Sequence, residues 1–187
     1  RASEMERLAV PFMETALRCL EAEPRLRFAV PLVNARLRDQ LELVIQGLAP
    51  SLPITLVDGQ SRAVIAAADC VLTASGTATL ETAIMGVPMV ILYRVSPLSF
   101  WLAKKVIRVP HIGLVNLIAE REIVPELIQD QANPESIAET VRKFVNTPSA
   151  LDAIRHAFGG VRYRLGGPGA SARVADIALN MIKENKP

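Results

Sequence analysis

The sequence has few cysteines, histidines and tryptophans, and it has no long apolar run. Two cysteines, two histidines and one tryptophan occur among its 187 residues. The longest apolar runs, residues 63–68 and 87–93, are far shorter than the roughly 20 residues that a membrane-spanning helix needs. The N-terminal residues 1–7 also lack the apolar core of a signal peptide. We therefore expect no transmembrane helix, and the default expectation is a cytoplasmic protein.

The sequence also offers little for metal chemistry. Cys19 lies in a helical pattern and Cys70 in a strand pattern, both among apolar neighbours, which is typical of buried reduced thiols. His111 and His156 are isolated, with no partner at ligand spacing, so neither is assigned to metal binding or to catalysis. No Asp-x-Asp motif occurs, which argues against a metal-dependent sugar transferase. We expect no metal and no cofactor.

Composition is that of a folded domain. Hydrophobic residues make up 50% of the chain, which excludes disorder and supplies a core for one domain of ordinary size. The net charge of +2 gives no reason to expect a nucleic-acid partner. The chain opens at Arg1 without an initiator methionine, and a helical pattern begins almost at once. This start predicts a fragment of a longer protein.

Strand and helix patterns alternate up to residue 94. The strand patterns are short, continuous apolar runs, which is typical of a sheet covered by helices on both faces. The predicted strands cover residues 27–31, 54–57, 70–73 and 88–94. The predicted helices cover residues 4–22, 35–47, 61–68 and 77–85, with Pro11 bending the first and Asn34 capping the second. The alternation predicts an α/β fold, Rossmann-like and doubly wound, with a mostly parallel sheet.

Helical patterns dominate after residue 94. They cover residues 97–108, 116–119, 122–129, 134–146, 149–165 and 171–184, and one weak strand is indicated at 111–115. Glycines at 159–160 and within 166–169 predict flexible points. We therefore divide the chain into a Rossmann-like domain over residues 1–148 and a helical tail over residues 149–187.

The most informative segment, residues 69–81, turns from an apolar strand straight into a helix. Ser75, Gly76 and Thr77 stand where the first helical amides have no intrahelical partner and the helix dipole adds positive charge, which favours a phosphate. Glu81 follows Thr77 by one helical turn, on the same face. A carboxylate beside a phosphate site indicates a ligand that carries both phosphate and sugar hydroxyls.

The same segment also fits an ordinary strand-to-helix turn. Glycine permits a tight bend, serine and threonine cap helices, and the dipole favours an acidic residue near a helix start. A capping box does not explain Glu81, because a Thr77 cap would place Leu80 at the reciprocal position. Both interpretations stay open on the spacing alone.

Two polar residues and one basic segment add to this picture. Arg94 ends a strand at the edge where open α/β sheets bind ligands, and its guanidinium can fork onto phosphate, although a plain surface arginine fits too. Asn116 either caps a helix or contacts a ligand. The segment 97–108 holds the only tryptophan with several cations, which suits a helix lying on an anionic membrane or one packed in the core with solvated lysines.

Several segments combine into a more specific pattern. They are Phe28-Ala-Val-Pro-Leu-Val-Asn34, Ala74-Ser-Gly-Thr-Ala-Thr-Leu-Glu81, Pro88-Met-Val-Ile-Leu-Tyr-Arg94, Phe100-Trp-Leu-Ala-Lys104 and Gly113-Leu-Val-Asn-Leu-Ile-Ala-Glu-Arg-Glu122. Together they resemble lipid-A-disaccharide synthase, a family of inverting glycosyltransferases with the two-domain B-type fold. The resemblance runs from residue 1 to about residue 184.

The resemblance implies that residues 1–148 are the UDP-sugar donor-binding domain, truncated at its N-terminus. In a sheet of order 3-2-1-4-5-6 the absent first strand would be central, between the strands at 27–31 and 70–73. The acceptor-binding N-terminal half would be absent as well, together with the general base. The isolated fragment would then be inactive and at best bind UDP.

The implied reaction belongs to lipid A biosynthesis, a step toward lipopolysaccharide in Gram-negative bacteria. It transfers 2,3-diacylglucosamine from UDP-2,3-diacylglucosamine to 2,3-diacylglucosamine 1-phosphate (lipid X), giving lipid A disaccharide 1-phosphate and UDP. By analogy with B-type enzymes, Glu81 would accept hydrogen bonds from the ribose hydroxyls. The other implied UDP-sugar-binding residues, which contact the diphosphate or line its cleft, are Arg1, Ser75, Gly76, Thr77, Arg94 and Asn116.

The implied substrates carry acyl chains, so the resemblance also places the enzyme on the inner face of the inner membrane as a peripheral protein. The expected membrane-facing residues are Phe100, Trp101, Lys104 and Lys105. Glycine-rich joints at 159 and 166 would permit exchange of the tail between protomers, giving a homodimer.

Three other functions are weighed against this one. Two are other B-type UDP-sugar enzymes, the peptidoglycan N-acetylglucosaminyltransferase and a UDP-N-acetylglucosamine 2-epimerase, and the segments 94–104 and 113–122 argue against both. The third is a non-catalytic membrane-associated module. Retention of the turn at 75–77 and of Glu81 weighs against the third.

Overall fold

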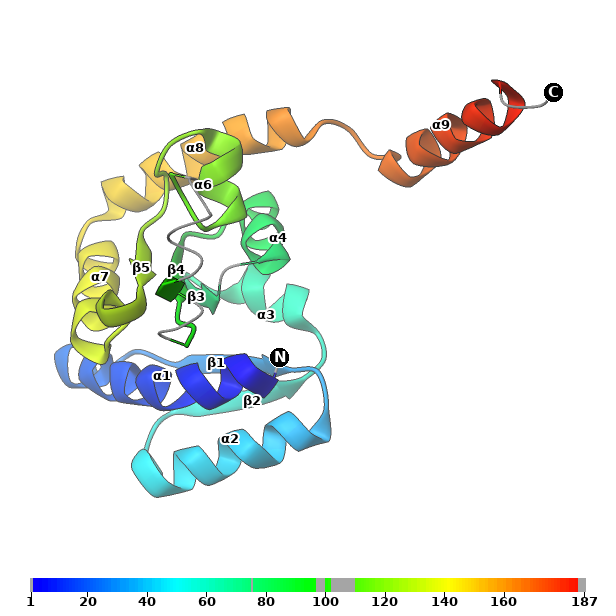
Figure 1. The fold of residues 1–187 in the computed structure, drawn as a ribbon. Helices are drawn as coiled ribbons and strands as arrows, with labels where there is room; N and C mark the ends of the chain where they lie inside the picture. The colour runs from blue at the N-terminus through cyan, green and yellow to red at the C-terminus, as the bar shows by residue number, and fades with distance from the viewer. Residues whose placement is uncertain (1, 75, 97–99, 102–109, 185–187) are drawn as a thin grey trace.

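The computed structural model describes residues 2–74, 76–96, 100–101 and 110–184. It has the predicted α/β architecture of parallel strands and covering helices (Figure 1). The first elements are α1 (Ala2–Ala22), β1 (Phe28–Leu32), α2 (Ala35–Leu48), β2 (Ile54–Asp58), α3 (Ser61–Ala67), β3 (Val71–Ala74), α4 (Thr77–Met85) and β4 (Met89–Tyr93). Each of them matches a predicted element.

Local chemistry explains two of these helices. α2 begins at the predicted cap, because Asn34 Oδ1 accepts a hydrogen bond from the Leu37 amide at 3.0 Å. The same helix runs through Gly47 and ends at Leu48. α1 continues through Pro11, where the Thr15 hydroxyl donates to the Pro11 carbonyl oxygen at 2.7 Å.

The elements after residue 110 are α6 (Leu114–Ala119), β5 (Glu126–Ile128), the 3-10 helix η1 (Gln129–Gln131), α7 (Pro134–Asn146), α8 (Pro148–Leu165) and α9 (Ala170–Glu184). Two predictions are wrong here. The weak strand at 111–115 is a bend leading into α6, and the helix at 122–129 is a loop followed by β5. β5 is a strand because its backbone pairs with β4, and such pairing overrides a local helical pattern. The helix predicted at 97–108 lies outside the described residues, apart from the helical Phe100 and Trp101.

The described strands form two parallel sheets. β1 pairs with β2, and β4 lies between β3 and β5. An apolar groove of about 330 Å³ lies between the sheets, lined by α1, by Val30 of β1 and by residues 72–74 of β3, and it reaches Gly76. No backbone pairing therefore joins β1 to β3 within the described residues. The groove between them lies where the resemblance placed an absent central strand.

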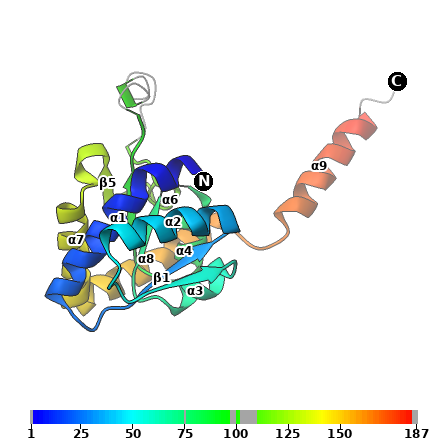
Figure 2. The same cartoon turned by 90° about the horizontal axis from the view of Figure 1, so that it is seen from below.

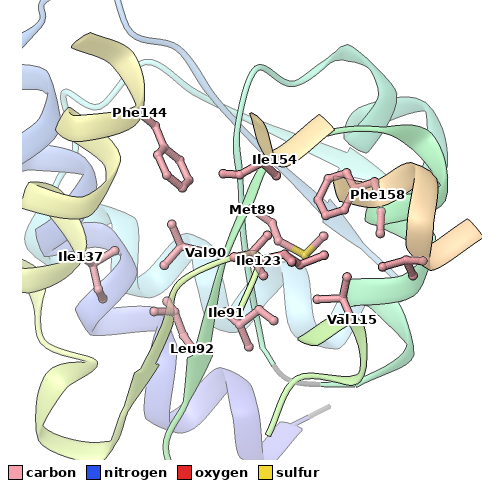
Figure 3. Packing of buried hydrophobic residues seen from close by; sticks show 13 residues of the cluster. Met89, Val90, Ile91, Leu92, Val115, Ile123, Ile137, Phe144, Ile154 and Phe158 are labelled. Atoms are coloured by element: carbon pink, nitrogen blue, oxygen red, sulfur yellow. The ribbon is translucent and has the colours of Figure 1, made fainter. Parts of the chain in front are cut away.

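The larger core surrounds β4. Met89, Val90, Ile91 and Leu92 are each 0% exposed. Figure 3 shows their side chains alternating, with Val90 and Leu92 toward α7 and the other two toward α6 and α8. A second cluster, formed by α1, α2 and β1, fills the space under the smaller sheet. β4 is thus covered on both faces, as its continuous apolar sequence predicts.

The two last helices differ in their packing. α8 contributes Ile154, Phe158 and Val161 to the core around β4, and Gly159 and Gly160 lie inside this helix rather than at a joint. α9 extends away from the body after the glycines at 166–169, as both views show (Figures 1 and 2). Within the helical tail predicted over residues 149–187, the part that leaves the body therefore starts after Leu165.

Both cysteines are free thiols with suppressed acidity. Cys19 is buried on α1, and Cys70 packs against the core around β4. Burial raises the pKa of Cys19 and raises the pKa of Cys70 to about 12. Since the thiolate is the reactive form, neither side chain is a nucleophile at neutral pH.

We expect iodoacetamide at pH 8 to alkylate Cys70 at least about a hundredfold more slowly in the folded protein than in urea, because the folded state holds the thiol proton. The raised pKa has a matching effect on stability. The protonated thiol of Cys70 stabilises the folded state below about pH 8.5, the ordinary pKa of a cysteine in an unfolded chain. This contribution is lost as the pH rises toward the folded-state pKa of about 12. Mass spectrometry of the labelled peptides measures the rate, and equal labelling in both states would contradict the prediction.

Candidate functional site

The predicted turn lies at the carboxyl edge of the larger sheet. β3 ends at Ala74, Gly76 is the N-cap of α4, and Thr77 is the first residue of that helix. Gly76 has a φ of 148°, which L side chains rarely adopt, and a Cβ added there would meet no atom within 4 Å. The turn therefore combines a backbone that requires glycine with open space beside the first amides of the helix.

Hydrogen bonds from Thr79 hold this turn in place, and Arg162 of α8 contacts the opposite end of α4. The backbone amide and the hydroxyl of Thr79 both donate to the Gly76 carbonyl oxygen, at 3.1 and 2.7 Å, and Thr79 is completely buried. At the other end of α4 the guanidinium of Arg162 donates to the Ala83 carbonyl oxygen at 3.4 Å. A cation at the C-terminus stabilises the helix dipole, whose positive end is the Gly76 turn.

Arg94 follows β4 at the same edge of the sheet. Ala74 of β3 and Leu92 of β4 are partners in the parallel register, and Gly76 and Arg94 each follow that pair by two positions. Neighbouring strands lie about 4.8 Å apart, so β3 and β4 end side by side at the same edge of the sheet. Arg94 is exposed. An exposed arginine and a helix N-terminus thus follow neighbouring strands at one edge of the sheet, and both are suited to an anionic ligand.

Glu81 lies on α4, half-buried, and its carboxylate has a cationic neighbour. The Arg62 guanidinium at the start of α3 donates to Glu81 Oε1 at 3.2 Å. The side chains are 77% and 40% exposed, so this surface pair contributes little to stability. Glu81 remains accessible one turn beyond the open turn, which is compatible with the predicted contact to a ribose.

Asn116 is placed differently from the expectation. Its side chain is 0% exposed, and its amide nitrogen donates at 2.8 Å to the Val124 carbonyl oxygen and at 2.8 Å to Glu126 Oε1. Its amide oxygen accepts from the backbone amides of Ile123 and Val124, at 2.9 and 3.1 Å. All four hydrogen-bonding positions of the side chain are used. Asn116 therefore ties α6 to β5, and we leave it out of the proposed ligand contacts.

The structure describes only some of the remaining predicted site residues. Arg1, Ser75, Lys104 and Lys105 lie outside the described residues. Phe100 is half-buried, and Trp101 is 53% exposed. The sequence alone gave no reason to select Arg62, Glu126 or Gln129, whose partners lie on other elements of the fold.

Comparison with known proteins decides the family. A family model described as lipid-A-disaccharide synthetase matches residues 1–158. The chain belongs to the lipid-A-disaccharide synthase family. It is 41% identical over 186 residues to the lipid-A-disaccharide synthase of Pseudomonas syringae, an alignment that covers 97% of this chain and 46% of the relative. It is 45% identical over 149 residues to that of Pseudomonas putida, covering 80% of this chain and 39% of the relative.

The chain thus spans less than half the length of these lipid-A-disaccharide synthases. Among solved structures, a putative UDP-N-acetylglucosamine 2-epimerase from Listeria monocytogenes superposes with a TM-score of 0.58 at 15% identity. That match covers 100% of this chain and 44% of the other. At such low identity it supports the fold only.

Two further properties of the site region concern the described residues alone. Within them, no group of three or more His, Cys, Asp or Glu side chains is arranged to hold a metal ion. Likewise, none of the helices described is both long enough and apolar enough to cross a membrane.

Proposed function

We propose that this chain is the donor-binding half of a lipid-A-disaccharide synthase. The whole enzyme would transfer 2,3-diacylglucosamine from UDP-2,3-diacylglucosamine to lipid X and release UDP. The observation that carries the proposal is the open Gly76 turn at the sheet edge where β4 also ends, just before Arg94, in a chain of this family. Ser75, Gly76 and Thr77 would donate to the diphosphate, Arg94 would pair with it, and Arg1 would approach from the other wall.

The chemistry follows from where charge develops. Breaking the bond between sugar and phosphate builds negative charge on UDP, and amides fixed at a helix N-terminus stabilise that charge without reorganising. Arg94 adds a charge-assisted contact at the same edge. Glu81 would hold the ribose hydroxyls and so fix the nucleotide against the turn. The general base that deprotonates the acceptor hydroxyl would come from outside this chain.

The test is a product assay on the full-length protein with two donors, UDP-2,3-diacylglucosamine and UDP-N-acetylglucosamine, and lipid X as acceptor. We expect disaccharide only from the acylated donor. Turnover of the unacylated donor to an epimer, or to a glycosylated peptidoglycan precursor when that precursor is supplied as a second acceptor, would favour one of the other B-type enzymes. Binding of UDP without turnover of either donor would favour the non-catalytic module.

We further propose that the segment 97–108 faces the inner membrane in the complete enzyme, since its sequence is basic and carries Phe100 and Trp101. Reversing the charge at Lys104 and Lys105 is expected to weaken binding to vesicles containing anionic lipid by about thirtyfold or more, because each of the two lost cations near such a surface contributes about 1 kcal/mol. Vesicle co-sedimentation measures this effect. Reversal at Lys143 on α7 serves as the control, and an equal loss from both variants would contradict the proposal.

The helix α9 supports a proposal about assembly. Its apolar side chains Val174, Ile177, Leu179, Met181 and Ile182 are 54–66% exposed and it extends from the body on a glycine-rich joint. We propose that a second copy covers this face by exchanging the helix. Truncation after Leu165 in the full-length protein is expected to convert a dimer into a monomer in sedimentation velocity. A monomeric wild type would contradict the proposal.

A further inference from the structure

One glutamine side chain holds the end of β4 to the end of β5. Gln129 Oε1 accepts a hydrogen bond from the Val95 amide at 2.7 Å, and Gln129 Nε2 donates to the Val95 carbonyl oxygen at 3.1 Å. The two residues are 34 positions apart in the chain. A side-chain amide that pairs with both polar groups of one residue reproduces a rung of a β-ladder.

This side chain continues the sheet beyond its last backbone pair. The ladder between β4 and β5 ends at Tyr93 and Ile128. At Gln129 the backbone turns away with a φ of 51°, in the left-handed region that non-glycine residues seldom occupy. The side chain of Gln129, rather than its main chain, therefore supplies the next rung. A residue keeps such a strained backbone conformation only where the surrounding contacts hold it in place.

The consequence falls on Arg94. Tyr93 before it is fixed by the ladder, and Val95 after it is fixed by Gln129. The backbone of Arg94 is thus held at both sides, while its side chain is exposed and its strand ends at the same sheet edge as β3, which leads into the Gly76 turn. Since a guanidinium must meet phosphate oxygens within hydrogen-bond distance, the position of its backbone sets whether it reaches them.

We propose that Gln129 is a positioning residue that sets the place of Arg94 against the diphosphate of the donor. The inference rests on the proposed function, because it requires that Arg94 contacts the diphosphate. Gln129 acts through Arg94 in this scheme and makes no contact with the ligand itself. Its replacement should therefore affect a phosphate-bearing ligand and spare the nucleoside.

The experiment uses the full-length protein and measures affinity for UDP by titration calorimetry and for uridine by NMR titration. Gln129→Ala is expected to weaken UDP binding about tenfold, because a small misplacement of a charged contact costs about this much, and to change uridine binding less than about twofold. In an Arg94→Ala background the same change is expected to have no further effect on UDP. Gln129→Glu, which keeps the acceptor for the Val95 amide but loses the donor, should give an intermediate loss.

Asn133→Ala is the matched control. Asn133 also uses its side-chain amide on the backbone in both directions, donating to the Asp130 carbonyl oxygen at 2.7 Å and accepting from the Ser136 amide at 2.9 Å, and neither of these partners belongs to β4. Its replacement should leave UDP binding unchanged.

The outcomes separate the two proposals. If Arg94→Ala leaves UDP binding intact, the proposed role of Arg94 fails, and this inference fails with it. If Arg94→Ala weakens UDP binding but Gln129→Ala and Gln129→Glu do not, the positioning role alone is overturned. Equal losses for UDP and uridine in the Gln129 variants, or additive losses in the double variant, would show a general structural role instead.

Discussion

Replacing Asn116 with alanine is expected to lower the free energy of unfolding by about 3 kcal/mol or more. The change leaves the buried amides of Ile123 and Val124 and the carbonyl oxygen of Val124 without the hydrogen-bond partner that Asn116 provides. Each buried polar group left without a partner costs about 1–3 kcal/mol. It also removes a neutral donor from Glu126, whose carboxylate accepts from the amides of Ile112 and Gly113 at 2.8 and 3.0 Å. Urea unfolding of the full-length protein measures the loss.

Two controls sharpen this prediction. Asn133→Ala removes a half-buried helix cap on α7 and should cost only about 1 kcal/mol. Asn116→Asp keeps the size and the acceptor oxygen but replaces the donating nitrogen, and it places a carboxylate against Glu126. We expect this variant to be destabilised as well. An Asn116→Ala variant no less stable than Asn133→Ala would contradict a structural role and return Asn116 to the ligand site.

Glu81→Gln and Glu81→Ala are expected to weaken UDP binding by about 10- to 100-fold. A hydrogen bond to a charged group contributes about 1.5–3 kcal/mol, and the carboxylate is proposed to accept from the ribose hydroxyls. The ribose makes the prediction specific. UDP should lose far more affinity than 2′-deoxy-UDP, which already lacks one of the two hydroxyls. Calorimetric titration of both nucleotides into each variant measures the difference.

The controls for Glu81 come from the surface of the same chain. Glu139→Gln removes an exposed carboxylate that accepts from Lys143 at 2.9 Å on α7, remote from the turn, and should leave UDP binding unchanged. Arg62→Ala removes only the ion pair with Glu81, and exposed pairs are worth up to about 1 kcal/mol, so we expect at most a fivefold loss. Equal UDP binding by wild type and Glu81→Ala would remove Glu81 from the site.

The elements that were predicted well are those with a local cause. α4 was predicted from Thr77 to Met85, because Gly76 and Gly86 bound an apolar helical pattern, and both glycines have positive φ in the structure. Asn34 was predicted as a cap from its position alone, and the cap bond forms within four residues of chain. These features depend on neighbours that the sequence shows side by side.

The predictions that failed concern residues whose structure depends on partners far away along the chain. β5 is only three residues long, and its strand character comes from pairing with β4, which starts 37 residues earlier in the chain. Asn116 offered two local interpretations, a cap or a ligand contact, and its actual partners lie on the following loop and on β5. Gln129 carried no local signal at all, because its partner Val95 lies beyond the end of a neighbouring strand.

The sequence by itself determined the alternation of strands and helices, the parallel character of the sheet and the presence of a glycine turn before α4. Hydrophobic periodicity and turn residues act over a few positions, so their effects can be read in order along the chain. The tertiary structure decided that β3 and β4 end in register at one edge of the sheet, that Asn116 is buried, and that α8 packs on the core while α9 extends from it. Those features arise from strand register and from burial between distant segments, whose free energies depend on which surfaces meet.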